Sequence, residues 1–306
     1  MRPLKPLLSL TFLSAFLIFC SCSKDENDAK IPGIAENKNK NLTNIYPEAS
    51  RLEFPKLKGG SSIVLVHRTN DKYGVNFCTE WDTQKKSQRW SCYQMHAGNY
   101  GGNVGRYKDG YPYDDQLDSK YYFNTDLYWS SGYQHGHICP SADRQYSTEA
   151  NRQTFFLTNM QPQRGALNEG PWQAMENQVR TWVSNGIKRN TLDTLYVCRG
   201  GTIDRDDQIK GLIMNQMIIP KYFFMALLSK NASGYKALAF WIEHKDYDTD
   251  YPKDVQGNYN LSSYVTNIRE LETLTGIDFF CNLDDETENH VETLGVENIK
   301  SAWGLK

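Results

Sequence analysis

The sequence lacks several features that would assign it to a familiar class of protein. No Cys-x-x-Cys pair occurs in its 306 residues, so a zinc site built on paired cysteines is not expected. Positive charge is not in excess, because 34 Lys and Arg residues stand against 36 Asp and Glu residues, which gives a formal net charge of −2. The overall electric field therefore does not hold nucleic acid, and a polyanionic substrate would need a local basic patch or a metal ion. No internal repeat is found either, which favours a single main domain.

The first residues also lack an apolar run of the roughly 20 residues that a membrane span needs. Arg2 and Lys5 precede a shorter apolar stretch that stops at cysteine, and we predict a lipoprotein signal peptide over residues 1–21. Its end resembles a bacterial lipobox, and Cys22 fits the lipid-bearing position better than Cys20 because a small residue precedes it. An uncleaved membrane anchor is the alternative. We therefore expect an exported protein that is lipid-anchored, through Cys22, to the bacterial outer membrane or cell surface.

Residues 22–59 are charged, rich in asparagine and without apolar periodicity, which predicts a flexible tether. Residues 60–306 then form the predicted domain. Five cysteines lie beyond Cys22, and Cys78 with Cys92 could bridge neighbouring strands in an oxidising compartment. An odd number of cysteines leaves at least one free thiol.

The pattern of elements in the domain predicts an α+β fold. Alternating apolar and polar residues predict strands at 61–68, 73–81, 89–95, 194–200, 222–229 and 236–243. Helical periodicity predicts helices at 147–154, 168–186 and 262–274. Strands so close in sequence are expected to be antiparallel. Residues 97–132 are rich in Gly, Tyr and Asp, which predicts a long ordered loop of functional importance.

One stretch, "YQHGHICPSADR" (133–144), concentrates residues with chemical potential. His135 and His137, two residues apart on a strand, would face the same way and could bind zinc together. No suitable third ligand lies nearby, and Gly136 indicates a close backbone approach or a turn rather than a plain strand. Two solvent-facing histidines without a role are the other alternative.

The neighbouring motifs change this interpretation. "GHICPSADR" (136–144), "TNMQPQRGALNEGPW" (158–172), "ENQVR" (176–180) and "IRELETLTGIDFFCNL" (268–283) follow in an order and spacing that resemble the DNA/RNA non-specific endonucleases. The resemblance implies a central antiparallel sheet flanked by helices, with a ββα-metal active-site motif. It also implies a Mg²⁺-dependent endonuclease, with Mn²⁺ as a substitute, that cleaves DNA and RNA with little sequence choice. No protein partner is evident.

The resemblance assigns roles to three residues of the central motifs. His137 would be the general base that takes a proton from water. Asn168 would be the single direct ligand of the metal, although an asparagine at a helix start is often only a cap. Glu176 would orient a metal-bound water, and Arg180 would pair with it or touch phosphate; a solvated i,i+4 ion pair is the alternative for both.

Two further residues match the family less tightly. Arg106, in "GRYKDGYPYDD", resembles an upstream arginine that binds phosphate. Asn159 resembles an asparagine that supports the site by hydrogen bonding, and an ordinary turn asparagine is the alternative. Aromatic residues of the 97–132 loop could stack on bases or simply pack within the loop.

The chain departs from the family at its central tetrad, where Gln134-His135-Gly136-His137 replaces Asp-Arg-Gly-His. The arginine would have been a permanent clamp for phosphate, and we expect His135 to replace it only when protonated. This change raises two alternatives. One is a catalytically weakened surface lipoprotein that binds nucleic acid or serves as a scaffold, and the other is a phosphodiesterase for some small substrate.

Overall fold

The structure is a computed structural model that describes residues 36–70, 74–102, 104–249 and 251–305. The predicted signal peptide, Cys22 and the tether up to residue 35 lie outside these residues. Within the described ranges, no helix has both the length and the apolar character required to cross a membrane.

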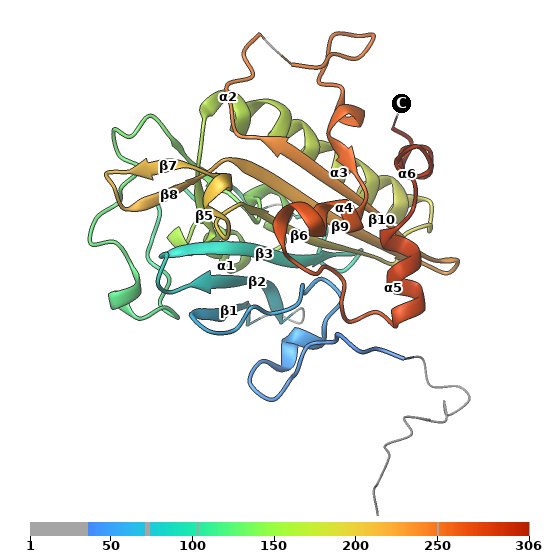
Figure 1. Cartoon of the computed structure of the whole chain (residues 1–306), viewed down its shortest axis with the longest axis horizontal. Coiled ribbons are helices and arrows are strands. Elements are labelled where there is room, and N and C mark those ends of the chain that lie inside the picture. The colour runs from blue at the N-terminus through green and yellow to red at the C-terminus, as the bar shows by residue number, and fades with distance from the viewer. Residues whose placement is uncertain (1–35, 71–73, 103, 250, 306) are drawn as a thin grey trace, which may run out of the picture. The chain divides into compact units, whose positions relative to one another are not determined.

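A seven-stranded sheet forms the centre of the domain (Figure 1). Its neighbouring strands are all antiparallel, and their order is β1-β2-β3-β6-β9-β10-β11. The strands are β1 (Ser62–Arg68), β2 (Val75–Asp82), β3 (Ser87–Met95), β6 (Thr194–Gly201), β9 (Tyr222–Asn231), β10 (Gly234–Glu243) and β11 (Val265–Thr266). The predicted α+β fold with a central antiparallel sheet flanked by helices is confirmed, and all six predicted strands are present.

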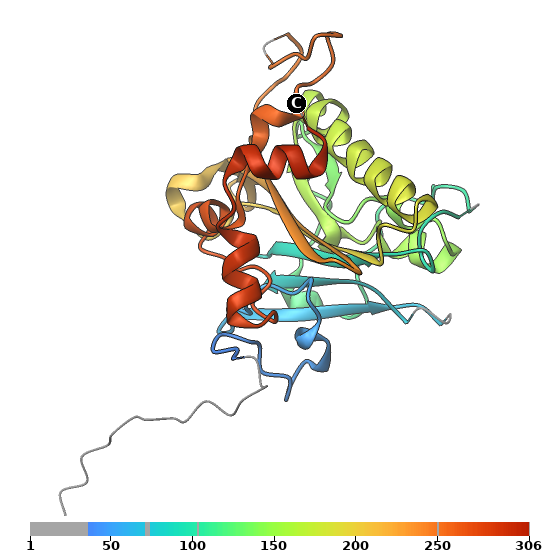
Figure 2. The same ribbon diagram turned by 90° about the vertical axis from the view of Figure 1, so that its right-hand side faces the viewer.

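Helices cover both faces of this sheet, because its strands alternate apolar residues between the two faces. On β9, Phe223 and Met225 belong to one core, whereas Phe224 and Ala226 belong to the other. The first core also contains residues of α3 (Gln173–Lys188) and α6 (Val296–Trp303). The second contains residues of α4 (Ile268–Thr275) and α5 (Asp285–Glu292), so the sheet lies between two helical layers (Figure 2).

A separate ββα unit is built beside the sheet. Strand β4 (Gln134–His137) pairs antiparallel with β5 (Met160–Gln163), and the chain then forms the short α2 (Gly165–Leu167), kinks at Gly170 and continues as α3. The other elements are α1 (Thr148–Gln153), the β7 (Ile209–Ile213) and β8 (Met217–Pro220) hairpin, and 3₁₀ turns at Pro47–Ser50, Ser119–Tyr121, Ser141–Arg144, Leu157–Asn159, Asp206–Gln208 and Leu261–Tyr264. The ββα unit brings the central motifs of the sequence together.

The predicted flexible tether is wrong over residues 36–59, because this segment packs on the domain. Phe54 is fully buried in the second core. The Nδ2 atom of buried Asn41 donates to the carbonyl oxygens of Ala49 and Pro55, at 3.2 and 2.9 Å. The asparagines that suggested disorder instead satisfy buried backbone groups, and the compact unit spans Ala35–Lys306 rather than starting at residue 60.

The predicted helix at 262–274 is wrong in its first half. Val265 and Thr266 form β11, which pairs with β10, and the helix α4 begins only at Ile268. The Asn267 side chain caps it by accepting from the backbone N–H of Glu270 at 2.7 Å. Gly276, with φ of 69°, ends it as the pattern predicts.

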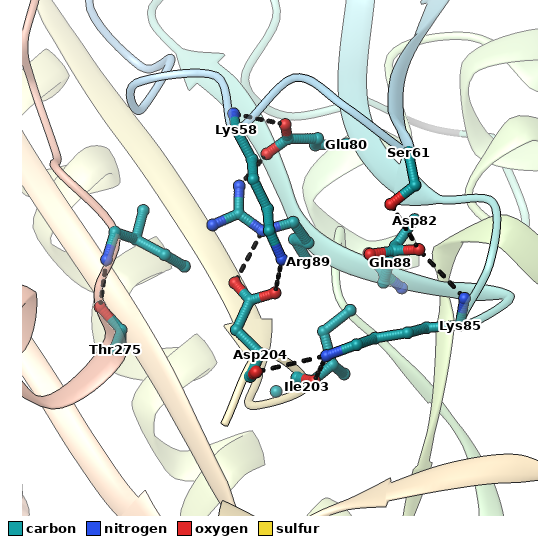
Figure 3. A network of polar contacts seen from close by, with 12 residues as sticks. Lys58, Ser61, Glu80, Asp82, Lys85, Gln88, Arg89, Ile203, Asp204 and Thr275 are labelled. Carbon is teal, nitrogen blue, oxygen red and sulfur yellow. Dashed lines mark hydrogen bonds and ion pairs between the residues drawn. The ribbon is translucent and has the colours of Figure 1, made fainter. Parts of the chain in front are cut away.

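Buried polar contacts fasten the start of β1 to its neighbours (Figure 3). The guanidinium of Arg89 lies between the carboxylates of Glu80 and Asp204, and its Nε is 2.8 Å from Asp204 Oδ2. The backbone N–H of Lys58 donates to Glu80 at 2.9 Å. Burial raises the pKa of Glu80, and the charge of Arg89 opposes that rise. This network holds the chain before β1 against β2, β3 and the segment after β6.

Three cysteines lie in one row across the sheet. Cys78 on β2 is directly opposite Cys92 on β3, which is in turn opposite Cys198 on β6. All five cysteines of the described residues are free thiols and buried. The register therefore suits the suggested Cys78–Cys92 bridge, but the bond itself is not formed in this structure.

Candidate active site

The central motifs of the sequence converge on one open cleft of about 730 Å³. Four of the predicted site residues line it: Arg106, His135, His137 and Asn168. The remaining lining residues include Tyr111, Asp126, Tyr128, Trp129, Gln134 and Glu169. A larger hollow of about 920 Å³, between α3 and the loop around residues 251–262, contains none of the predicted site residues.

His137 occupies the last position of β4 and is half-buried. The edge of its ring meets the face of Phe155, with ring centres 4.7 Å apart. Burial, followed by the positive charge of Arg106, lowers the pKa of His137 to about 3. Its Nε2 atom is buried and has no hydrogen-bond partner within the described residues. An unsatisfied polar atom is costly at a purely structural position, so a neutral imidazole of this kind indicates a functional site.

Gly136 allows the two histidines to stand on this strand. A Cβ atom at this position would lie 2.3 Å from the side chain of Gln163, which passes over the glycine from β5. Any larger residue would therefore displace the Gln163 side chain. The expected close approach to the backbone of Gly136 is present, but the expected turn is not, because Gly136 pairs with Gln161 within strand β4.

Asn168 is not a helix cap. The helical backbone begins three residues earlier, at Gly165, and Asn168 itself has helical angles of −60° and −46°. Its Nδ2 atom donates to Gln134 Oε1 at 2.7 Å, whereas Oδ1 accepts no hydrogen bond from any described residue. The backbone is helical at Asn168 but kinks two residues later, where Gly170 has non-helical angles of −102° and −119°. Asn168 therefore lies in the short turn ahead of α3, where its side chain reaches Gln134 on β4 and lines the cleft.

Gln134 connects two residues of the opposite wall. Besides accepting from Asn168, it donates from Nε2 to Glu169 Oε1 at 2.6 Å. An aspartate at this position, as in the family tetrad, could not make the second bond while ionised, because it has no donor. In this chain the glutamine that replaces the tetrad aspartate donates a hydrogen bond, and the carboxylate of Glu169 accepts it.

His135 does not lie where a phosphate clamp is expected. Its ring is stacked between Tyr111 and Tyr128, with ring centres 3.7 and 4.0 Å away, and its Nε2 is 2.9 Å from Asp126 Oδ2. Burial lowers its pKa, and the Asp126 charge opposes this. Both faces and one nitrogen are thus engaged, which argues against the prediction that His135 contacts phosphate.

Arg106 is the predicted cation that remains exposed in the cleft. Its guanidinium carbon lies 4.7 Å from the centre of the Phe155 ring, the same ring that His137 contacts. A cation held over an aromatic face keeps its charge available to a ligand. The arginine and the imidazole therefore approach the cleft from one side.

Glu176 and Arg180 lie behind the cleft and do not line it. Glu176 Oε1 is 2.6 Å from Arg199 Nη2, whereas Arg180 is 4.0 Å from the other carboxylate oxygen. Arg180 pairs more closely with Asp143, at 2.8 Å. The predicted pairing of Glu176 with Arg180 is thus weak, and each has a stronger partner. Burial raises the pKa of Glu176, and the Arg199 charge opposes the rise.

Arg199 and Asp143 are the members of this network that the sequence prediction missed. They are joined through the Tyr93 hydroxyl, which donates to Asp143 at 2.8 Å and accepts from Arg199 at 3.4 Å. The sequence held a signal for Arg199, because it lies inside the apolar strand run "TLYVCRG". Arginine is rarely buried without a partner, so this position predicts a buried ion pair.

Asn159 is fully buried and supports β4 from below. Its Oδ1 accepts from the backbone N–H of Cys139 at 2.8 Å and from the Ser91 hydroxyl at 3.1 Å. Its Nδ2 donates to the carbonyl oxygens of Cys139 and Thr154, both at 2.8 Å. This is the geometry of a supporting residue, because its bonds join Cys139, two residues after His137, to Ser91 on β3 and to Thr154.

Comparisons with known proteins agree with this geometry. A family model described as DNA/RNA non-specific endonuclease matches residues 64–286, a range that includes every residue lining the cleft. The chain is similar to a nuclease of Nostoc sp., with 28% identity over 218 residues that cover 71% of this chain and 75% of the other. It is also similar to the mitochondrial nuclease EXOG of Xenopus laevis, with 22% identity over 289 residues that cover 91% of this chain and 75% of that protein.

A solved structure has the same fold. It is described as "Crystal structure of the EndoG/EndoGI complex: Mechanism of EndoG inhibition". The TM-score is 0.60 at 20% sequence identity, and the match covers 75% of this chain and 91% of the other chain.

Proposed function

This chain belongs to the DNA/RNA non-specific endonuclease family, and on that premise we propose that it is a divalent-metal-dependent endonuclease that hydrolyses the phosphodiester bonds of DNA and RNA with little sequence choice. One observation carries the proposal. His137, with a neutral imidazole, and Asn168, whose amide oxygen has no partner among the described residues, line the same cleft. Hydrolysis of a phosphodiester requires a base for water and a group that holds positive charge near the phosphate.

The cleft residues fit a hydrated Mg²⁺ ion, which is the typical metal of the family. Asn168 presents Oδ1, because Gln134 holds the other end of its amide, and the Glu169 carboxylate is on the same wall. A site with so few protein oxygens suits Mg²⁺, which keeps most of its water shell, and Mn²⁺ shares its preference for oxygen ligands. When bound, the ion would offset negative charge on the scissile phosphate and the departing oxygen.

The side chains then divide the remaining work. His137 accepts a proton from the water whose oxygen bonds to phosphorus, and the bond from phosphorus to the 3′ oxygen breaks. The departing 3′ oxygen takes a proton from a second water, which leaves 5′-phosphate and 3′-hydroxyl ends. Arg106 contacts a phosphate oxygen. Because the Arg106 charge helps to lower the pKa of His137, a phosphate bound to Arg106 raises that pKa and makes the imidazole a better base.

These contacts do not distinguish one base from another, because every nucleotide presents the same phosphate to Arg106 and His137. Trp129 adds a second sequence-independent contact. It lines the cleft and 80% of its surface is exposed, as expected of a side chain that stacks on a base.

The test is cleavage of plasmid DNA and of RNA by the purified protein, first with Mg²⁺ and then with a chelator. We expect metal-dependent cleavage of both, loss of at least about a hundredfold in His137→Ala and in Asn168→Ala, and normal activity in the matched control His290→Ala, whose histidine is exposed on α5. Cleavage that persists in His137→Ala would contradict the assigned base.

The alternative function is a surface lipoprotein that binds nucleic acid without cutting it. The absence of the tetrad arginine favours this alternative, because the His135 ring is already engaged by Tyr111, Tyr128 and Asp126. Binding of both nucleic acids without metal-dependent cleavage in the parent protein would support it over the nuclease.

We also propose that the chain is exported and anchored through lipid on Cys22, after removal of residues 1–21. Metabolic labelling with palmitate tests this. The parent should carry the label and sediment with membranes, and Cys22→Ser should do neither, whereas Cys20→Ser should behave like the parent.

A further inference from the structure

Four carboxylates converge far from the cleft, where α4 and α5 meet the N-terminal segment. One carboxylate oxygen from each of Glu272, Asp278 and Glu292 lies within 4.8 Å of the others. Calcium–oxygen distances are about 2.4 Å, so oxygens that share one ion lie at most about 4.8 Å apart. Glu288, one turn before Glu292 on α5, is the fourth acid. The spacing of the three oxygens therefore allows one cation to touch them all.

Two buried oxygen atoms at this cluster have no hydrogen-bond partner among the described residues. One is Oε1 of Glu292, a residue that is only 1% exposed. The other is Oδ1 of Asn39, whose Nδ2 atom donates to Glu288 at 2.8 Å and to Asp278 at 3.1 Å. Buried oxygens without a donor are costly, and a cation is a ligand that would satisfy both.

The positive charge present at the cluster is smaller than its negative charge. Arg269 is the cation in contact, 2.6 Å from Glu292 and 3.1 Å from Glu272, and half of its side chain is exposed. Lys56 also faces Asp278. Two positive charges therefore face four carboxylates, and a divalent ion would offset the remaining negative charge.

We propose that Glu272, Asp278 and Glu292, with the amide oxygen of Asn39, form a calcium-binding site that fastens the N-terminal segment to helices α4 and α5. The donors are all hard oxygens from separate segments, a set that suits the flexible coordination of Ca²⁺ better than the strict octahedron of Mg²⁺. Leu271 and Val291, buried in the second core, hold the two helices in place and so fix the carboxylates.

This site is independent of the cleft. Helices α4 and α5 contribute to the core on one face of the sheet, whereas α3, which continues from Asn168, contributes to the core on the other (Figure 2). Its occupation therefore stabilises the domain and protects residues 36–59, and it does not supply the metal for cleavage.

The experiment measures Ca²⁺ binding in a background without the proposed catalytic metal ligand. The purified Asn168→Ala protein is stripped with a chelator and titrated with CaCl₂ in a calorimeter, and its melting temperature is recorded with and without Ca²⁺. We expect one equivalent of Ca²⁺ to bind and the melting temperature to rise by about 5 °C at a hundredfold excess over the dissociation constant. Ca²⁺ should also slow proteolytic cleavage within residues 36–59.

Adding Glu292→Gln, which keeps the shape of the side chain, should remove the binding heat and the rise in melting temperature. The matched control Glu297→Gln changes an exposed acid on α6 and should retain both. If Glu292→Gln does not fold, Asp278→Asn is expected to lower Ca²⁺ affinity at least about tenfold. Absence of binding in Asn168→Ala, or equal binding with and without the cluster substitutions, would overturn the proposal.

Discussion

The hydrogen bond from Asn168 to Gln134 allows a sharp test of how this variant tetrad works. Gln134→Leu removes both polar contacts of the side chain at nearly constant volume. The bond at 2.7 Å joins two neutral amides, and such a bond contributes about 1 kcal/mol. Without it, the amide of Asn168 can turn either end to the cleft, which lowers the fraction of molecules that present Oδ1.

A loss of about 1 kcal/mol corresponds to about a fivefold weaker hold on the metal, and residues that orient a ligand often contribute tenfold or more. We therefore expect the Mg²⁺ concentration for half-maximal cleavage to rise about fivefold to tenfold in Gln134→Leu. The rate at saturating Mg²⁺ should stay within about twofold of the parent, because the imidazole and the arginine are untouched. The measurement is the initial rate of plasmid cleavage across a Mg²⁺ titration.

Two controls make this prediction specific. Gln216→Leu, in the exposed turn between β7 and β8, should leave the Mg²⁺ dependence unchanged. In an Asn168→Asp background, Gln134→Leu should cause no further shift, because a carboxylate offers two equivalent oxygens whichever way it turns. An unchanged Mg²⁺ titration in Gln134→Leu, or a lower rate at every Mg²⁺ concentration without a shift, would refute the orienting role.

The remaining predictions concern substrate binding, acid stability and the support of β4. Trp129→Ala should raise KM for single-stranded nucleic acid about tenfold and leave both kcat and the melting temperature unchanged, since stacking contributes about 1 to 3 kcal/mol per base; Trp129→Phe should restore KM. Burial lowers the pKa of His244 to about 4, so the unfolded chain binds a proton that the folded chain refuses as pH falls from about 6.5 to 4. This costs up to about 3 kcal/mol of stability, and urea midpoints should fall over that window more steeply in the parent than in His244→Gln. Asn159→Ala leaves three buried backbone groups unpaired and should lower the free energy of unfolding by at least about 3 kcal/mol, measured in urea.

The acid prediction follows from the hydrogen bonds of His244. Its Nδ1 donates to the carbonyl oxygen of Pro220 at 2.7 Å, and its Nε2 accepts from the backbone N–H of Arg164 at 2.8 Å. Protonation would set a second N–H against that of Arg164, just before the helix that carries Asn168. Acid should therefore disturb this end of the ββα unit early in unfolding.

Six of the seven strands of the sheet were predictable because each depends on a local pattern; the exception is the two-residue β11. Alternation of apolar and polar residues gave all six predicted strands within two residues at either end. The β7 and β8 hairpin was missed because its turn has no glycine, and Met214 and Asn215 adopt left-handed angles instead. Helix α5 was missed because its sequence, "DETENHVE", is almost entirely polar and has only a narrow apolar face.

The positions of the site residues were predictable, whereas several orientations were not. His137 and Asn168 lie where the motifs placed them, in one cleft. The side chain of Asn168 does not take the capping role, because the helical backbone begins earlier and the kink at Gly170 separates Asn168 from α3; its amide bonds to Gln134 instead. The local sequence does not indicate which residue on β4 will form a hydrogen bond with the Asn168 amide. The stacking of His135 between two loop tyrosines likewise depends on where a long loop folds back.

The ββα unit needs the rest of the domain, because the residues that support its site residues lie on other strands. His137, Asn168 and Glu176 come from one stretch of sequence, and this is why ordered motifs can reveal them. The groups that support the unit come from the sheet: Ser91 on β3 donates to Asn159, and Arg199 on β6 pairs with Glu176. A fragment limited to the unit would keep these three residues and lose both contacts. It would therefore leave Glu176 buried without its main counter-charge, so the unit is expected to be active only as part of the whole domain.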